Sequence, residues 1–177
     1  VDTFLEGGLQ ALIEEEEEFF EENEFGERVR SLLSNKKRKD VIEARCPTLS
    51  FEDLLMKGSV TQQVPIIPGK FEPVFRSLYG EENEEILRLM GSIRGPNQYI
   101  LDVLTLFNLT AGLYGINDKI LPNHIDSKGD FKEEMFRAKH KVVRKMALPI
   151  LADLSVNFRW FTKRVQKLTV VDEIKGF

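Results

Sequence analysis

Apolar residues recur at steps of three and four over most of the chain, which is the spacing of one face of an α-helix. The pattern predicts four long helices, over residues 80–93, 97–113, 130–146 and 149–168. A shorter helix is predicted to start at the N-cap residue Ser50 and to end at Gly58. We therefore expect a mainly α protein.

One segment, at about residues 59–78, has the alternation of a β-hairpin instead. Its first strand face is formed by Val60, Gln62, Val64 and Ile66. Pro68 and Gly69 occupy the central positions of a type II-like turn. Pro65 and Pro73 each lack a backbone N–H, so we expect these strands at a sheet edge or in a two-stranded ribbon. Such a ribbon must pack on its own domain or complete a sheet in a partner.

Three further patterns refine the C-terminal half. A tight turn at Asn117-Asp118 is predicted between two short extended pieces. Asp130 and Glu133 have the spacing of a capping box. The inward residues of the helix that follows are predicted to be Phe131, Met135, Val142, Val143 and Met146. The last helix has a heptad-like seam of Leu151, Leu154, Phe158, Phe161, Val165 and Leu168. This seam favours packing in a bundle over a free coiled coil.

Charge is segregated along the chain. Residues 1–27 hold eleven acidic and no basic side chains, residues 28–45 hold seven basic against two acidic, and residues 131–177 hold eleven basic against five. Such segregation indicates pairing within the chain or between copies, or partners of opposite sign. We divide the chain into a charged N-terminal arm, residues 1–45, and a helical domain with the β-hairpin, residues 46–177.

The start of the arm has the pattern of an amphipathic acidic helix. Its apolar positions are Leu5, Leu9, Leu12, Ile13, Phe19 and Phe20. Five adjacent glutamates would destabilise this helix unless something basic or apolar covers it. Three interpretations stay open: a solvated acidic tail, a docking arm whose phenylalanines insert into a neighbouring subunit, or a mimic of DNA. The basic residues that follow are most simply the charge partner of the acidic segment.

The sequence has no pattern typical of an enzyme. It contains no phosphate-binding glycine loop, nucleophile elbow, dinucleotide fingerprint or Cys/His cluster, and it has one cysteine, Cys46. Glu81 and Glu82 are interpreted as a solvated helix N-terminus. His124 and His140 are interpreted as isolated surface or core residues. We therefore expect no catalytic residue, cofactor or metal.

The apolar run over residues 100–116 is too short to cross a bilayer and contains Asp102 and Asn108. We therefore expect a buried helix there and no membrane partner.

Two stretches together are similar to a known group of proteins. "VPIIPGKFEPVFRSLYGEENEEI", and "LTAGLYGINDKILP" followed by "LSVNFRWFTKRVQKL", resemble small tail, baseplate-hub or tail-assembly proteins of tailed bacteriophages. The resemblance covers about residues 50–170 and is one of pattern. It implies a structural or assembly subunit that binds other phage proteins, located in the virion or in the host cytoplasm during assembly. It brings no catalytic residues.

This interpretation predicts a set of partner-contact residues: Phe19, Phe20, Pro68, Gly69, Phe71, Phe75, Arg76, Phe158, Trp160 and Phe161. Self-association is a further possibility that the segregated charge favours. The alternative is a nucleic-acid-associated phage protein that uses the basic segments 28–45 and 131–167. Binding to phosphates would weaken steeply with added salt, whereas an apolar subunit interface would not.

Overall fold

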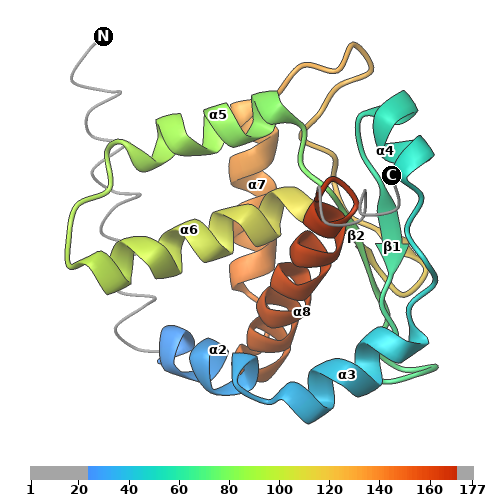
Figure 1. The fold of residues 1–177 in the computed structure, drawn as a ribbon. Helices are drawn as coiled ribbons and strands as arrows, with labels where there is room; N and C mark the ends of the chain where they lie inside the picture. The colour runs from blue at the N-terminus through green and yellow to red at the C-terminus, as the bar shows by residue number, and fades with distance from the viewer. Residues whose placement is uncertain (1–23, 171–177) are drawn as a thin grey trace, which may run out of the picture.

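The computed structural model describes residues 24–170, and within them the chain is mainly helical with a small antiparallel sheet, as predicted (Figure 1). The helices of this part are α2 (Phe25–Leu33), α3 (Lys36–Arg45), α4 (Phe51–Lys57), α5 (Gly80–Met90), α6 (Asn97–Gly112), α7 (Glu133–Arg144) and α8 (Leu148–Lys167). The strands are β1 (Thr61–Gln63), β2 (Pro73–Arg76), β3 (Leu113–Ile116) and β4 (Lys119–Ile120).

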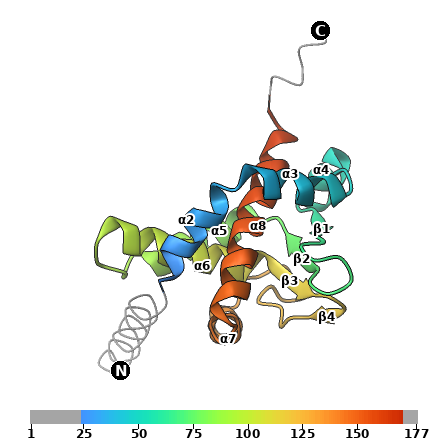
Figure 2. The same cartoon turned by 90° about the horizontal axis from the view of Figure 1, so that it is seen from below.

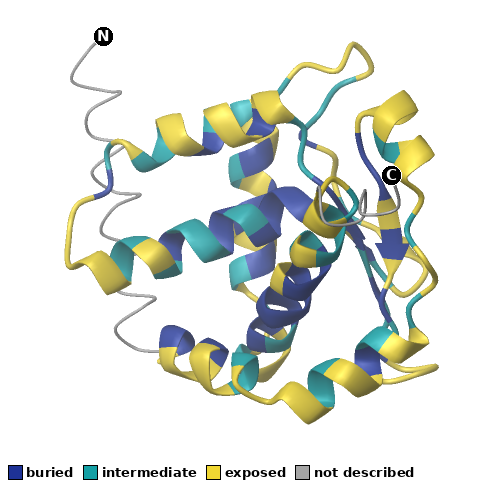
Figure 3. Ribbon diagram, viewed as in Figure 1, coloured by how far each residue is buried: buried dark blue, intermediate teal, exposed yellow. Residues whose placement is uncertain are grey.

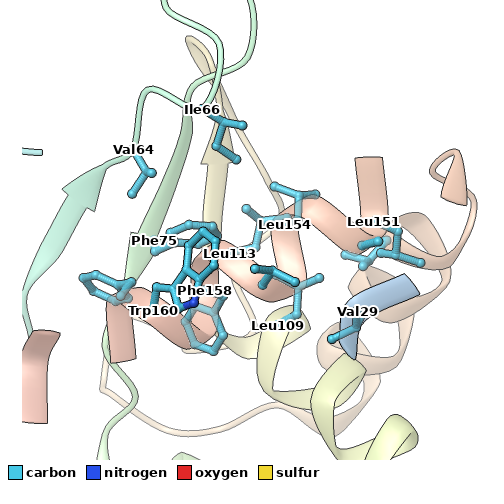
Figure 4. Packing of buried hydrophobic residues seen from close by; sticks show 14 of the residues in the cluster. Val29, Val64, Ile66, Phe75, Leu109, Leu113, Leu151, Leu154, Phe158 and Trp160 are labelled. Atoms are coloured by element: carbon cyan, nitrogen blue, oxygen red, sulfur yellow. The ribbon is translucent and has the colours of Figure 1, made fainter. Parts of the chain in front are cut away.

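Helix α8 lies at the centre of the molecule, between the sheet and helices α5 and α6 (Figures 1 and 2). Most of its predicted seam is buried, and Leu151, Leu154 and Phe161 on it are fully buried. Phe75 of β2 packs against Phe158, with ring centroids 5.4 Å apart (Figure 4). The seam therefore forms the main core of the molecule.

The predicted hairpin forms, with β1 and β2 as its antiparallel arms. Its turn is closed by a hydrogen bond from the Lys70 N–H to the Ile67 carbonyl, and Gly69 has a φ of 77°. The predicted strand face is buried along its length: Val60, Gln62, Val64 and Ile66. The hairpin thus packs on its own domain, which was one of the two predicted arrangements.

The expectation that both strands lie at a sheet edge or in an isolated ribbon is wrong for β2. The sheet order is β1-β2-β3-β4, so β2 pairs on both sides. Pro73 is tolerated because it is the first residue of the strand, where one missing donor breaks little of the ladder. Its carbonyl still accepts a hydrogen bond of 2.8 Å from the Val64 N–H. Pro65 lies beyond the end of β1.

The predicted turn at Asn117-Asp118 also forms, between β3 and β4. Asn117 has a φ of 54°, in the left-handed region that asparagine tolerates better than most residues. Its side chain links the two hairpins, because Oδ1 accepts from the Glu72 N–H at 2.9 Å and Nδ2 donates to the Lys70 carbonyl at 3.1 Å. Two hairpins that are separate in sequence are thereby joined in one sheet.

The predicted capping box of α7 is wrong. The helix begins at Glu133, and the Asp130 N–H instead donates to the Asp126 side chain at 2.9 Å. The predicted inward residues Met135 and Val142 are 43% and 44% exposed. The buried face of α7 consists of Phe136, Lys139, His140 and Val143. The predicted and the observed sets of inward residues both have helical spacing. The observed set is buried because Phe136 packs against Phe107 of α6.

Helices α2 and α3 pack on the body although they lie inside the predicted N-terminal arm (Figure 2). Phe25, Val29 and Ile42 belong to the same core cluster as the seam of α8. Arg38 of α3 forms an ion pair of 2.7 Å with Asp153 of α8. The acidic segment that precedes α2, residues 1–23, lies outside the described residues.

The remaining helix predictions are confirmed. Ser50 caps α4 by accepting from the Asp53 N–H at 3.2 Å, and Gly58 ends that helix with a φ of 76°. Helix α6 forms where a buried helix was expected, but its buried residues all lie between Val103 and Gly112, and Leu101 is 54% exposed. Among residues 24–170, no helix is both long enough and apolar enough to cross a membrane.

Candidate functional site

The residues predicted to contact partners fall into different environments. Two lie outside the described residues: Phe19 and Phe20. Two are exposed at the hairpin turn: Pro68 and Gly69. Five aromatic residues are buried in the core: Phe71, Phe75, Phe158, Trp160 and Phe161 (Figure 4). The tenth, Arg76, lies in a buried ion pair. Among the described residues of this predicted set, a partner could contact Pro68 and Gly69 without rearrangement of the core.

Arg76 and Glu82 form a bidentate ion pair inside the protein. Arg76 is the last residue of β2, and Glu82 lies in the first turn of α5. Arg76 Nη1 and Nη2 donate to Glu82 Oε1 and Oε2 at 2.6 and 2.7 Å. Glu82 Oε1 also accepts from the Tyr79 N–H at 3.0 Å, which is the backbone half of a capping box. The pair joins the sheet to α5.

His124 completes this cluster from the loop that follows β4. Its Nε2 lies 2.7 Å from Glu82 Oε2, so an ionised Glu82 requires the proton of the neutral ring on Nε2. Burial lowers the pKa of His124 more than the bond to Glu82 raises it, which favours the neutral ring. His124 is fully buried, and its Nδ1 has no hydrogen-bond partner among the described residues.

Burial and hydrogen bonding act on Glu82 in opposite directions. Burial alone would raise the pKa of Glu82, but the hydrogen bonds from His124 and Arg76 outweigh it and lower the pKa to about 2. Glu82 is therefore ionised at neutral pH.

Lys139 of α7 is 3% exposed. Burial lowers its pKa to about 7, with Arg76 acting in the same direction and Glu82 opposing. The Glu82 carboxylate and the Lys139 ammonium therefore both have strongly shifted pKa values.

Shifted pKa values of this kind occur at catalytic sites and also in structural ion pairs. The geometry around Glu82 distinguishes between the two roles. A hollow of about 500 Å³ borders Glu82, between the start of α5 and the loop of residues 123–131. Glu82, however, accepts hydrogen bonds from Arg76, His124 and Tyr79 and has no oxygen left for a substrate proton. Lys139 is not among the described residues that line this hollow. The Glu82 carboxylate therefore links β2, α5 and the loop that carries His124.

The sequence interpretation missed this cluster. The interpretation of Glu82 as solvated is wrong, because this residue is buried. His124 is a core residue, one of the two environments expected for it, but it is not isolated, because it is hydrogen-bonded to Glu82. The available signal was the position of Glu82, three residues after Tyr79, since an N3 glutamate often turns back to the helix start. Nothing in the local sequence of His124 indicates that it approaches Glu82.

A groove of about 500 Å³ lies between α5, α6 and the C-terminal half of α8. Its apolar lining consists of Leu78, Leu101, Leu104, Phe158 and Val165. Among the described residues that line it, Arg159 is the one charged side chain. We call it the α6–α8 groove.

Helix α4 presents a second apolar surface. None of its seven residues is buried, and Phe51, Leu55 and Met56 are 48%, 69% and 76% exposed (Figure 3). Single exposed apolar residues are common on protein surfaces, and α4 carries three of them on two helical turns.

Several basic residues of the segments 28–45 and 131–167 are paired within the molecule. Arg30 lies 3.4 Å from Asp102, and Arg164 donates to Glu43 at 3.3 Å and to Gln62 Oε1 at 2.8 Å. These side chains would have to leave their partners to bind phosphates.

The described part of the chain defines a mainly helical protein with a four-stranded antiparallel sheet and two apolar surfaces. Within it, no group of three or more His, Cys, Asp or Glu side chains could hold a metal ion. Comparison of the sequence with protein-family models and with curated proteins, and of the fold with solved structures, found no match.

Proposed function

We propose that this protein is a non-enzymatic subunit that works by binding other proteins, and that it is a component or an assembly factor of a bacteriophage tail or baseplate. The observation that carries the binding role is the exposed apolar surface of α4. The assignment to a phage rests on the resemblance of the two sequence stretches that surround the hairpins.

The α4 surface suits a protein partner for an energetic reason. A helix of seven residues is not stable alone in water, and α4 is held by its caps and by contact of the half-buried Leu54 with the core. Its outward residues, Leu55 and Met56, therefore contribute little to the fold. Burying each of them against a partner would contribute about 1.5–3 kcal/mol.

Two observations weigh against the other classes of function. The carboxylate of Glu82 is fully occupied by donors, so the buried cluster supports structure better than catalysis. Arg30, Arg38 and Arg164 are paired with carboxylates, which leaves the nucleic-acid alternative fewer free cations.

The test is incorporation into particles. Leu55→Ser/Met56→Ser should leave thermal unfolding unchanged and reduce the amount of this chain that mass spectrometry finds in purified tails or tail-assembly intermediates. The matched control is Met135→Ser/Val142→Ser, which removes two exposed apolar residues from α7 instead.

Absence of the wild-type chain from particles and from assembly intermediates would contradict the phage assignment. Equal incorporation of both double variants would contradict the role of α4. Binding to duplex DNA that falls steeply with salt would support the nucleic-acid alternative instead.

A further inference from the structure

The α6–α8 groove has a composition that restricts what can fill it. The described residues that line it are apolar or neutral except for Arg159, which is exposed on α8. A suitable occupant has a few apolar side chains and one or two carboxylates near one end. A strongly charged segment would place unpaired charges against the neutral walls, which is costly.

The C-terminal segment, residues 171–177, starts beside this groove. Val165 and Gln166 line the groove at the end of α8, and the chain continues in a turn in which the Thr169 N–H donates to the Gln166 carbonyl at 3.1 Å. Gly80 and Asn83 at the start of α5 line the same groove. The segment therefore needs only to reverse direction to enter the groove.

The length of the segment is sufficient. The groove runs along α8 from Ser155 to Gln166, which is about 16 Å at the helical rise of about 1.5 Å per residue. Seven residues in extended conformation reach about 24 Å. The segment can thus span the whole groove and still turn at its start.

The sequence of the segment matches the lining. It reads Val-Asp-Glu-Ile-Lys-Gly-Phe, so two carboxylates, Asp172 and Glu173, precede the apolar residues Ile174 and Phe177. The carboxylates would meet Arg159 at the rim, and the apolar side chains would lie on Leu104 and Phe158. The acidic segment of residues 1–23 fits less well, because it carries far more negative charge than one arginine balances.

We infer that the α6–α8 groove is a docking site for the C-terminal segment of the same chain, residues 171–177, held by Ile174 and Phe177 and oriented by Arg159. This inference does not rest on the proposed function. It assigns one role, docking, to both the groove and residues 171–177.

Amide hydrogen exchange of the full chain tests this docking. The backbone amides of residues 171–177 should exchange about tenfold more slowly than those of the isolated peptide, the factor that 1.4 kcal/mol of docking free energy gives. Ile174→Ser/Phe177→Ser should abolish that protection. The control Lys175→Ser should retain it.

A charge exchange tests the orientation. Arg159→Glu alone, and Asp172→Lys/Glu173→Lys alone, should each reduce the protection, and the combined variant should restore it. Arg159 is exposed, so its replacement leaves the core intact.

Three outcomes would overturn the inference. The first is that residues 171–177 of the wild-type chain exchange as fast as the isolated peptide. The second is that their protection disappears when the protein is diluted. The third is that Phe19→Ser/Phe20→Ser speeds amide exchange in the groove while the C-terminal variants do not. The second outcome would identify a second copy as the occupant, and the third would identify the acidic segment.

Discussion

Glu82 is the residue at which the charged side chains of the interior converge. It accepts hydrogen bonds from a strand through Arg76, from a loop through His124 and from its own helix start through Tyr79. A buried ion pair adds little net stability compared with apolar residues, but removal of one partner leaves a buried charge unpaired. The cluster therefore links β2, α5 and the 121–132 loop through one carboxylate.

Glu82→Gln should lower the free energy of unfolding by about 3 to 5 kcal/mol, because it leaves the Arg76 guanidinium buried without a counter-charge. Urea unfolding at neutral pH measures this change. The control is Glu81→Gln at the neighbouring exposed position, with an expected change within about 0.5 kcal/mol. Equal effects of the two substitutions would contradict the structural role of the ion pair.

The lowered pKa of Lys139 predicts that the stability of the protein depends on pH. Its pKa is about 7 in the folded protein and near the ordinary value of 10.5 when unfolded, so between these values the unfolded chain binds the extra proton. Stability should therefore rise with pH over this window. Lys139→Met should reduce that slope by up to about 1.4 kcal/mol per pH unit.

The measurement is chemical unfolding at several pH values between 7 and 10. Lys141→Met, at an exposed position two residues further along α7, should keep the wild-type slope. An unchanged slope in Lys139→Met would show that this lysine keeps its proton in the folded state.

At the scale of elements, the first hairpin shows the difference between a local and a non-local property. Its turn follows from Pro68 and Gly69, whose conformational preferences are local. The central place of β2 follows from the second hairpin, which lies some forty residues further on and is joined through Asn117. No local pattern indicates that these two hairpins meet.

Gly69→Val should cost on the order of 1 to 3 kcal/mol of stability, because a β-branched residue is strained at a φ of 77°. A clash does not contribute, since a Cβ at this position meets nothing within 4 Å. Thermal unfolding measures the effect, with the exposed neighbour Lys70→Val as control.

The arms of this hairpin pack on the core, so the loss should appear in the unfolding of the isolated protein. If stability is unchanged and only assembly with a partner is impaired, the turn rearranges freely and acts solely in docking.

At the scale of the whole molecule, the central position of α8 determines which segments can be deleted without loss of stability. The seam of α8 contacts the sheet through Phe75, and Phe25 and Val29 of α2 belong to the same core cluster. The helices of residues 25–45 are therefore part of the body in the described structure.

Deletion of residues 1–23 should leave the unfolding temperature of the remaining chain nearly unchanged, since the described core starts at Phe25. Deletion of residues 1–33 should lower stability by more than about 3 kcal/mol, because it removes Phe25 and Val29 from the core. Calorimetry of both truncated proteins compares them directly. Failure of the first truncated protein to fold would place the acidic segment in the core.

The sequence by itself determined the class of fold, most helix positions, both turns and the seam of α8. These features depend on periodicity, capping and backbone preference, which act over a few residues. It also indicated that β-structure would be short.

Only the tertiary structure decided the rest. It selected the Phe136 and His140 stripe of α7 over the Met135 and Val142 stripe, and it placed β2 inside the sheet. It also brought His124 to Glu82 and buried Lys139. Each of these outcomes depends on contacts between residues far apart in sequence. The free energy of burying a helix face or a charged side chain depends on the residues that pack against it. Those residues are distant in sequence, so the local pattern carries no information about them.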